Sequence, residues 1–359
     1  MSAALVRRTL DLCRIASVTG NEANCADYTE AVLRDSGLAV QRVGLSVLAR
    51  TAARPGRDLI LLVGHTDTVP PKPGDGLPRV EGDRLYGLGA SDMKAGIAVM
   101  LELALAVGKH RDLPADVGFV FYDKEEGPWS ESGLGPVLAE CPWLRRAALA
   151  FCLEPSDNGV QVGCLGTLHA KVTFVGKAAH SARPWQGENA IHAAAPLLAA
   201  LAARAPVPVD CGGHRFVEVL SATLASGGAT RNVIPDHFTL NLNYRFAPGK
   251  SDESAVDDVR RFCAAACPER PPDVELVEVA PSGRVVLDNP QLARFLAVNG
   301  NTVAAKQAWT DVARLSQAGI DAVNLGPGLA AQAHQAGEYA SVALIAESYM
   351  QFARFLGLG

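Results

Sequence analysis

The feature that most constrains the fold is a set of three short apolar runs, each followed by polar side chains. Residues 59–64 (LILLVG) have the length and composition of a strand that is buried on both faces, as in a parallel sheet. Similar runs occur at 115–123 and 147–155. Sheets of this kind carry helices on both faces and bind ligands at the carboxyl ends of their strands. The chain is therefore expected to contain an α/β domain with a site at that edge.

The polar side chains after these runs are of the types that bind metals. His65 and Asp67 follow the first run, Glu125 and Glu126 follow the second, and Glu154 ends the third. A single His-x-Asp is a weak signal, because a histidine at a strand end is more often a structural residue. Three such strands converging on one edge make a stronger one. Asp67 could also accept a hydrogen bond from the imidazole of His65 and so orient the ring.

Two further candidates lie on turns. Asp92 occupies a glycine-rich turn before an expected helix at 95–107, where both of its oxygens could face outward and bridge two cations. His334 follows the expected strand 322–328 on a loop, where it could equally be an ordinary loop histidine. The set contains imidazole and carboxylate groups and no thiolate. It therefore suits zinc or another divalent cation in a catalytic site.

After residue 160 the pattern changes to that of a second domain. An alternating stretch is followed by a helix at 188–203, two strands, a helix at 251–267 and a strand at 273–280. This order is typical of a compact α+β sandwich. The expected catalytic domain comprises residues 1–164 and 285–359, and the inserted domain comprises residues 165–284.

Arg245 ends a strand of the insert, where its planar guanidinium could clamp a carboxylate, although a surface arginine at a strand end needs no such role.

Composition excludes some classes of function. The 359 residues leave room for two domains, and the formal net charge of −5 provides no basic field for nucleic acid. No apolar run has the length of a membrane span, and the first residues lack the core of a signal peptide. The eight cysteines have no CxxC spacing, which favours reduced thiols in a cytoplasmic protein.

Seven motifs together indicate a family. In chain order they are GHTDTVP (64–70), GLGASDMKAG (87–96), YDKEEG (122–127), LEPSDNGVQVGCLGT (153–167), GKAAHSARPWQGENAIH (176–192), RNVIPD (231–236) with NLNYRF (241–246), and LGPG (325–328) with AHQAGE (333–338). The chain resembles the dinuclear zinc aminoacylase/carboxypeptidase superfamily, and within it the actinobacterial type of succinyl-diaminopimelate desuccinylases. That resemblance covers nearly the whole sequence. It implies a mixed-sheet α/β catalytic domain with helices on both faces, and an inserted ferredoxin-like α+β domain that acts as a lid and in dimerisation.

The resemblance also implies a metal-dependent amide hydrolase with a defined ligand set. Asp92 would bridge two Zn²⁺ ions, for which Co²⁺ is an alternative. His65 and Glu154 would complete one site, and Glu126 and His334 would complete the other. The family also has a cis peptide directly after the bridging aspartate, here between Asp92 and the following methionine. The reaction implied is hydrolysis of N-succinyl-LL-2,6-diaminopimelate to succinate and LL-2,6-diaminopimelate in lysine and cell-wall biosynthesis.

Further roles follow from the same resemblance. Glu125 would be the general base, and Asp67 would orient His65. His180, in the insert, resembles a histidine that reaches the active site of the partner in a homodimer and stabilises the oxyanion there. Positions that would bind the small N-acyl amino acid substrate through its carboxylates are Asn232, Arg245, Thr310 and Gly326.

The chain departs from the family pattern near the substrate pocket, at Leu88, Ala95, Cys164 and Ala330. These departures leave the hydrolase class intact and keep other substrates open, as in an acetylornithine deacetylase, an aminoacylase or a zinc carboxypeptidase. A metal-free binding or scaffold protein on the same fold is a third hypothesis. It would be favoured by loss of a ligand, yet every ligand position and the base are present.

Overall fold

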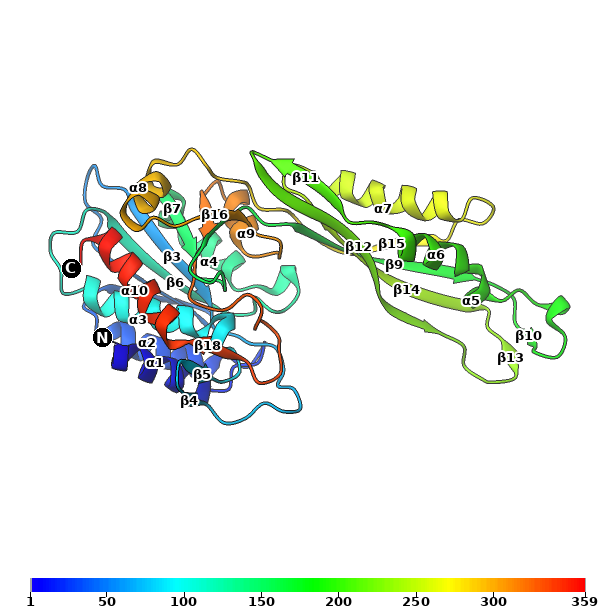
Figure 1. Cartoon of the computed structure of the whole chain (residues 1–359), viewed down its shortest axis with the longest axis horizontal. Coiled ribbons are helices and arrows are strands. Elements are labelled where there is room, and N and C mark those ends of the chain that lie inside the picture. Colours follow the sequence, from blue (N-terminus) through cyan, green and yellow to red (C-terminus); the bar gives the residue numbers. More distant parts are fainter. Residues whose placement is uncertain (1, 359) are drawn as a thin grey trace. The chain divides into compact units, whose positions relative to one another are not determined.

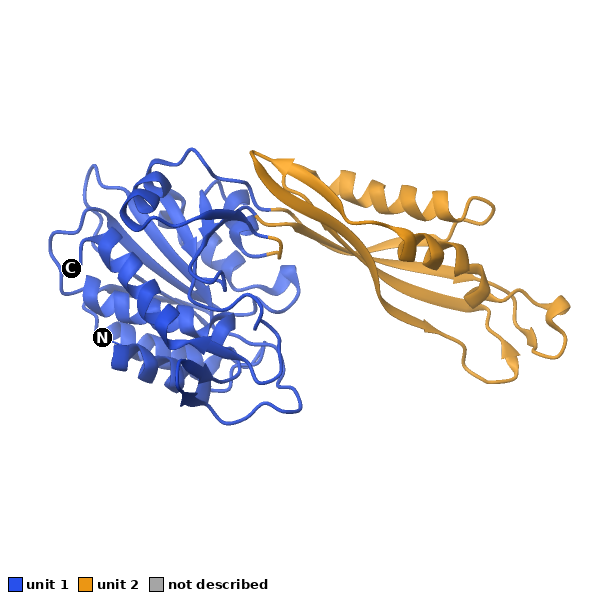
Figure 2. Ribbon diagram, in the orientation of Figure 1, with its two compact units in different colours: residues 1–163, 283–306, 310–359 blue, residues 164–282, 307–309 orange. Residues whose placement is uncertain are grey.

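Residues 2–358 are described by a computed structural model, in which the chain divides into two compact units (Figures 1 and 2). The first unit consists of the segment that ends at Gly163, Gly283–Lys306 and the segment that begins at Thr310. The second consists of Cys164–Ser282 and Gln307–Trp309. Cys164 thus lies in the second unit, and the chain re-enters the first unit at Gly283.

The first unit is built on an eight-stranded mixed sheet. Its strands, in spatial order, are β1 (Ala39–Val43), β2 (Ser46–Arg50), β6 (Asp116–Tyr122), β3 (Leu59–His65), β7 (Ala147–Cys152), β17 (Ala322–Asn324), β8 (Val160–Val162) and β16 (Val303–Ala305). Strand β3 runs parallel to both β6 and β7, while β1, β2 and the β8–β17 pair are antiparallel. The three apolar runs are therefore parallel neighbours, and their carboxyl ends meet at one edge, as the sequence predicted.

Helices cover both faces of this sheet. One face packs against α1 (Ser2–Arg14), α2 (Ala23–Arg34), α3 (Ala95–Val107), α8 (Pro290–Asn299) and α10 (Val342–Leu356), which share a core with Ile60 and Leu62 (Figure 1). Leu61 points to the other face, toward Trp143, where α4 (Leu134–Glu140), the short helix Pro142–Arg146 and α9 (Val312–Gln317) lie. A small antiparallel sheet is formed by β4 (Arg79–Glu81), β5 (Arg84–Tyr86) and β18 (Tyr339–Ser341).

The second unit is a five-stranded antiparallel sheet in the order β11-β12-β14-β9-β15. The strands are β9 (Gly166–Val175), β11 (Val207–Cys211), β12 (His214–Gly227), β14 (His237–Phe246) and β15 (Asp273–Ala280). Helices α5 (Ala190–Ala193), α6 (Ala195–Ala203) and α7 (Asp252–Ala266) cover the apolar face. Apart from β11, the chain order and the spatial order β12-β14-β9-β15 are those of a ferredoxin-like fold. A separate ribbon pairs β10 (Ala179–His180) with β13 (Val233–Ile234).

Several local predictions need correction. The expected helix 188–203 is interrupted at Ala194, because Pro196 begins the second segment and has no N–H to donate. The expected strand 322–328 ends at Asn324, where the Gly-Pro-Gly turn takes over. Helix α8, strand β11 and the small three-stranded sheet were not predicted from the sequence. No disulfide joins any of the eight cysteines, and Cys211 alone among them is not fully buried. None of the helices described combines the length and apolar character needed to span a bilayer.

The core between the sheet and its outer helices contains an aromatic cluster. The ring of Phe151 lies 4.9 Å from Phe295, 5.3 Å from Phe352 and 5.8 Å from Phe355, centroid to centroid. These rings are buried, and they join β7 to α8 and α10. They therefore attach the carboxyl-terminal segment, which returns after the second unit, to the sheet formed earlier in the chain.

Phe151→Ala should lower the free energy of unfolding by about 3–5 kcal/mol, because it removes a buried ring and leaves a cavity. Denaturant unfolding of the metal-free protein measures this without a contribution from ligand binding. Val298→Ala, at an exposed position of α8, is the control and should change stability by no more than about 0.5 kcal/mol. Equal effects of the two substitutions would show that the cluster is not a principal contact.

Candidate metal centre

The edge where the parallel strands end gathers imidazole and carboxylate groups. His65 is the last residue of β3, and its side chain is fully buried. Its Nδ1 lies 3.1 Å from the backbone oxygen of Asp67, which leaves Nε2 directed toward Asp92 and Glu154. Glu154 follows β7, and Glu126 follows β6. The pairing of β3 with both neighbours thus fixes the spacing of three of the five predicted ligands.

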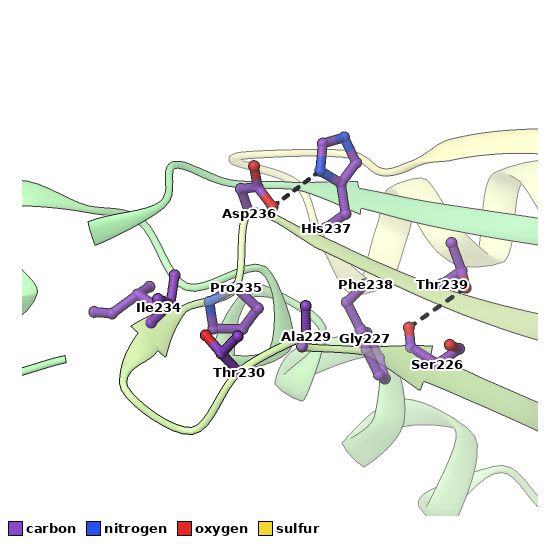
Figure 3. A pocket seen from close by; sticks show the side chains of 12 residues that line it. Ser226, Gly227, Ala229, Thr230, Ile234, Pro235, Asp236, His237, Phe238 and Thr239 are labelled. Carbon is purple, nitrogen blue, oxygen red and sulfur yellow. Dashed lines mark hydrogen bonds and ion pairs between the residues drawn. The ribbon is translucent and has the colours of Figure 1, made fainter. Parts of the chain in front are cut away.

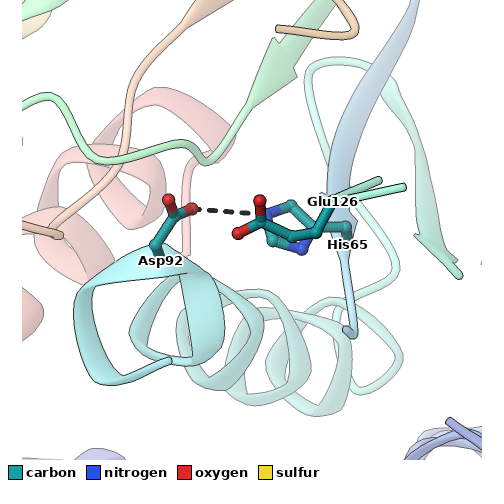
Figure 4. Close-up of side chains that lie close together, drawn as sticks. All are labelled: His65, Asp92 and Glu126. Atoms are coloured by element: carbon teal, nitrogen blue, oxygen red, sulfur yellow. Dashed lines mark hydrogen bonds and ion pairs between the residues drawn. The ribbon is translucent and has the colours of Figure 1, made fainter. Parts of the chain in front are cut away.

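Asp92 lies between two histidines. It is in the turn before α3, and its peptide bond to Met93 is cis, as the family resemblance implied. Oδ1 of Asp92 is 3.3 Å from Nε2 of His65, while Oδ2 is 3.5 Å from Nε2 of His334. Figure 4 shows His65, Asp92 and Glu126 pointing toward one another. Each carboxylate oxygen of Asp92 therefore faces a different histidine, which is the arrangement that a bridging ligand requires.

Each histidine also has its own glutamate. Nε2 of His65 lies 3.9 Å from Glu154, and Nε2 of His334 lies 2.9 Å from Glu126. Ligand atoms at about 2.0 Å from a tetrahedral Zn²⁺ are separated by roughly 3.3 Å, so these spacings fit such an ion. One ligand atom from each of His65, Asp92 and Glu126 also lies within 4.8 Å of the other two. The residues thus fit divalent cations.

The charge balance of the cluster also favours cations. Withdrawal from water raises the pKa of Glu154 to about 7, and the nearby charges of Asp92 and Glu126 add to the rise. Burial likewise raises the pKa of Glu125 well above its ordinary value, and Glu154 and Glu126 contribute. Carboxylates brought this close repel one another when ionised. A bound cation relieves that repulsion, so the cluster is suited to a metal.

The carboxylate of Asp67 accepts hydrogen bonds from backbone N–H groups and also lies beside the predicted ligand His65. Its Oδ1 accepts a hydrogen bond from the N–H of Glu125 (2.9 Å), and its Oδ2 accepts one from the N–H of Glu126 (3.0 Å). The hydroxyl of Thr19 donates to the same Oδ2 at 2.9 Å. The carboxylate is 3.5 Å from Nδ1 of His65. Asp67 therefore fixes the loop that carries both glutamates in addition to lying beside His65.

Two predicted substrate residues lie in the first unit but are not exposed. Gly326 packs against the chain near Glu154, and a Cβ there would collide with the backbone oxygens of Leu153 and Glu154. The absence of a side chain at Gly326 is thus a steric requirement of the fold. Thr310 is 2% exposed and precedes Asp311 at the start of α9.

Three other predicted residues lie in the second unit. His180 and Asn232 are neighbours on the β10–β13 ribbon, where the N–H of Ser181 donates to the backbone oxygen of Asn232 at 2.9 Å. Both residues are exposed. Nδ1 of His180 accepts a hydrogen bond from the N–H of Ala182 at 3.1 Å, so the proton of the neutral ring is on Nε2. His180 thus offers a donor to solvent.

The segment that carries Asn232 also lines a hollow of about 470 Å³. The hollow is formed by the ends of β12 and β14 and by the connecting loop with β13 (Figure 3). Its one ion pair joins Asp236 and His237 at 3.2 Å, and both side chains are largely exposed. The hollow is lined by residues of the second unit alone, whereas the predicted metal ligands are all in the first.

Arg245 has no carboxylate partner within 4.0 Å among residues 2–358. Its Nε donates to Oδ1 of Asn243 at 3.0 Å, and Nδ2 of Asn243 lies 3.0 Å from Nε2 of His169. Withdrawal from water lowers the pKa of Arg245, although the group stays charged. Among the described residues the hydrogen bond to Asn243 uses Nε alone, which leaves the terminal nitrogens available to bind an anion.

Sequence reasoning missed several residues around the cluster. Lys306 is 6% exposed and donates to the backbone oxygen of Pro155 at 2.9 Å, beside Glu154. Asp311 is buried, with Arg314 3.0 Å away and Tyr122 as a second partner. Glu338 accepts three backbone N–H groups from the turn of Asp92. The local periodicity of apolar residues does not mark a buried charged residue. For Glu338, the one signal in the sequence is its position four residues after His334.

Comparison with known proteins places the chain in a family. The model of peptidase family M20/M25/M40 matches residues 61–357. The chain belongs to this family. It is 38% identical over 355 residues, 98% of either chain, to a candidate succinyl-diaminopimelate desuccinylase, DapE, of Mycobacterium tuberculosis. It is 36% identical over 350 residues to the succinyl-diaminopimelate desuccinylase of Corynebacterium glutamicum, covering 96% of this chain and 92% of the relative.

Solved structures of other proteins share the fold. A tripeptidase of Staphylococcus aureus superposes with a TM-score of 0.81 at 22% identity, covering 99% of this chain and 98% of the other. A Bacillus subtilis protein described as a dinuclear metal-binding peptidase of family M20 gives 0.74 at 17% identity, with coverages of 99% and 97%. This M20 family member, which has a group of residues that could hold a metal ion, is a metal-dependent amidohydrolase.

Asp67→Asn should weaken Zn²⁺ binding about 10–100-fold, the usual cost of removing an outer partner of metal ligands. The amide has one acceptor oxygen, so it cannot receive both backbone N–H groups of the glutamate loop. Equilibrium dialysis against buffered Zn²⁺ measures the change, with Asp35→Asn, at an exposed helix end, as the control. Unchanged affinity would mean that the loop keeps its position without the carboxylate.

Proposed function

We propose that this M20 family member hydrolyses N-succinyl-LL-2,6-diaminopimelate to succinate and LL-2,6-diaminopimelate, a step of lysine and cell-wall biosynthesis. The observation that carries this proposal is identity of 36–38% over almost the full length of two relatives described by that activity. The eight free cysteines are consistent with a reducing, cytoplasmic location.

The proposed centre holds two Zn²⁺ ions, with Co²⁺ as an alternative. Asp92 would bridge them, His65 and Glu154 would complete one site, and Glu126 and His334 would complete the other. The spacing of the two oxygens of Asp92 from two different histidines supports this assignment. The Bacillus subtilis structure, described as dinuclear, supports the count of two.

The metal ions would polarise the acyl carbonyl and lower the pKa of the attacking water. Glu125 then accepts a proton from that water and delivers it to the nitrogen of the leaving amine. Burial and the neighbouring carboxylates raise the pKa of Glu125, which makes it a better proton acceptor than an ordinary carboxylate. Glu126 cannot share this task, because its lone pairs are engaged as a ligand. Asp67 keeps Glu125 in place through the backbone N–H that it accepts.

The residues predicted to bind the substrate would recognise its carboxylates. The substrate has an acidic acyl group, and Arg245 has free guanidinium donors and no acidic partner within ion-pair distance among the described residues. Asn232 is exposed on the β13 side of its ribbon. We assign these two residues, with Thr310 and Gly326, to the substrate.

His180 is proposed to act in trans in a homodimer, as the oxyanion donor in the site of a second copy. The hydrogen bond from the N–H of Ala182 to its Nδ1 supports this role, because the donor is then Nε2–H of a neutral ring. One such donor contributes about 3–4 kcal/mol to transition-state stabilisation in comparable sites.

The substrate is tested by comparing kcat/KM for N-succinyl-LL-diaminopimelate and N-acetylornithine on Zn²⁺-loaded protein. A preference of about a hundredfold or more for the succinyl compound, equal to about 2.7 kcal/mol, is expected. Glu125→Gln should then lower kcat about 10²–10⁴-fold while both metal ions stay bound. Faster hydrolysis of the acetyl compound would assign the chain to another deacylase of the family.

The role of His180 is tested by mixing two inactive variants, Glu125→Gln and His180→Ala, under conditions that let subunits exchange. If His180 acts in trans, each mixed dimer contains one site with an intact base and an intact donor. Random reassortment should restore about one quarter of the wild-type activity. If His180 acts within its own chain, no site has both groups and the mixture stays inactive.

A further inference from the structure

Glu338 is a buried acid that is directed at backbone and not at the predicted ligand atoms. It is 3% exposed and lies four residues after His334. Its Oε1 accepts hydrogen bonds from the N–H groups of Ser91 (2.7 Å) and Asp92 (2.9 Å), and its Oε2 accepts one from Gly89 (2.8 Å). Three donors from one turn thus converge on a single carboxylate.

These bonds join two segments that are distant in the sequence. The turn contains Asp92, while Glu338 closes the loop that contains His334. Further bonds run between the same segments: the N–H of Gly87 donates to the backbone oxygen of Glu338 at 3.0 Å. The hydroxyl of Ser91 donates to the backbone oxygen of Tyr339 at 2.7 Å and accepts from the N–H of Leu329 at 3.0 Å. The turn of Asp92 and the loop of His334 are therefore joined by one set of hydrogen bonds, at the centre of which is the carboxylate of Glu338.

The other ligands do not depend on it. His65 ends β3 and Glu154 follows β7, and the backbone of both strands is fixed by parallel pairing within the sheet. The loop of Glu126 is held by Asp67. His334, half exposed on its loop, has no sheet pairing of its own. Asp92 belongs to both proposed cation sites, so both depend in part on the turn that Glu338 holds. The site with His65 and Glu154 takes its other ligands from the ends of paired strands, whereas the site with Glu126 and His334 also needs the loop that Glu338 ties to the turn.

We propose that Glu338 is a positioning residue that sets the affinity of the cation site formed by Glu126, His334 and Asp92. This inference rests on the two-cation centre proposed above. It requires a carboxylate at position 338, because two acceptor oxygens receive three N–H groups. A glutamine offers one acceptor oxygen and would turn an N–H toward at least one backbone N–H.

The test is a Zn²⁺ titration of the metal-free protein, wild type against Glu338→Gln, by calorimetry and by equilibrium dialysis with elemental analysis. The wild type should bind two Zn²⁺. In Glu338→Gln the weaker site, assigned to Glu126 and His334, should lose about 10–100-fold in affinity, while the stronger site, assigned to His65 and Glu154, should lose clearly less because only its shared ligand Asp92 is affected. The control is Glu347→Gln, an exposed position of α10, which should leave both affinities unchanged.

The outcomes separate this inference from the proposal on which it depends. A wild type that binds a single Zn²⁺ would overturn the two-cation centre itself. A wild type that binds two, with unchanged affinities in Glu338→Gln, would overturn the role of Glu338 alone. Equal weakening of both sites would also contradict it, because a general loss of structure would act in this way.

Ser91→Ala is a second variant for the case in which Glu338→Gln does not fold. It removes two hydrogen bonds between the same segments without removing a buried charge. It should weaken the same site, and by less. Far-UV circular dichroism and the unfolding midpoint of the metal-free variants show whether the fold is retained. Selective loss of one Zn²⁺ from a folded variant supports the inference, and full retention of both by Ser91→Ala opposes it.

Discussion

The constraint on which the rest of this molecule depends is the parallel alignment of β6, β3 and β7. Because these strands are paired in register and buried on both faces, the residues that follow them must emerge together at one edge. Imidazole and carboxylate groups are thereby brought within a few ångströms before any loop is considered. The turn of Asp92 and the loop of His334 add their side chains to this cluster, whose position is set by the sheet.

Carboxylates this close repel one another, so the segments that carry them must be held in place. Two further carboxylates hold these segments through hydrogen bonds from backbone N–H groups. Asp67 accepts the backbone N–H groups of the glutamate loop, and Glu338 accepts those of the turn before α3. In each case a buried acid fixes backbone and leaves the neighbouring acidic side chains free to face the centre. The bonds to N–H groups favour the charged form of both acids, whereas burial opposes it.

The sequence predicted what depends on local periodicity and could not predict what depends on distant contacts. The runs around β3, β6 and β7, the helix α3 and the succession of strands and helices in the second unit all follow from apolar spacing, whereas the ferredoxin-like fold of that unit was implied by the family resemblance. Lys306, Asp311 and Glu338 are single charged residues inside the fold, and no spacing rule marks a buried charge. Asp67 was identified because it lies two residues after His65. Its hydrogen bond from the N–H of Glu125 joins residues 58 positions apart in the sequence and was not predicted. The small three-stranded sheet joins residues near 80 to residues near 340. It could not be predicted either, because its pairing is between segments that are distant in the sequence.

The division of the chain separates two kinds of requirement. Every predicted ligand and the base are in the first unit, where parallel strands and buried acids leave little freedom for substitution. Arg245, Asn232 and His180 are in the second unit, on an antiparallel sheet and a short exposed ribbon that the metal cluster does not need in order to form. Cys164, one of the departures from the family pattern, is buried in this second unit and close enough to Arg245 to influence its charge. On the roles proposed above for Arg245 and Asn232, substrate preference can change through the second unit while the hydrolytic chemistry of the first is retained. The proposed ligand set therefore constrains the reaction more than it constrains the acyl group.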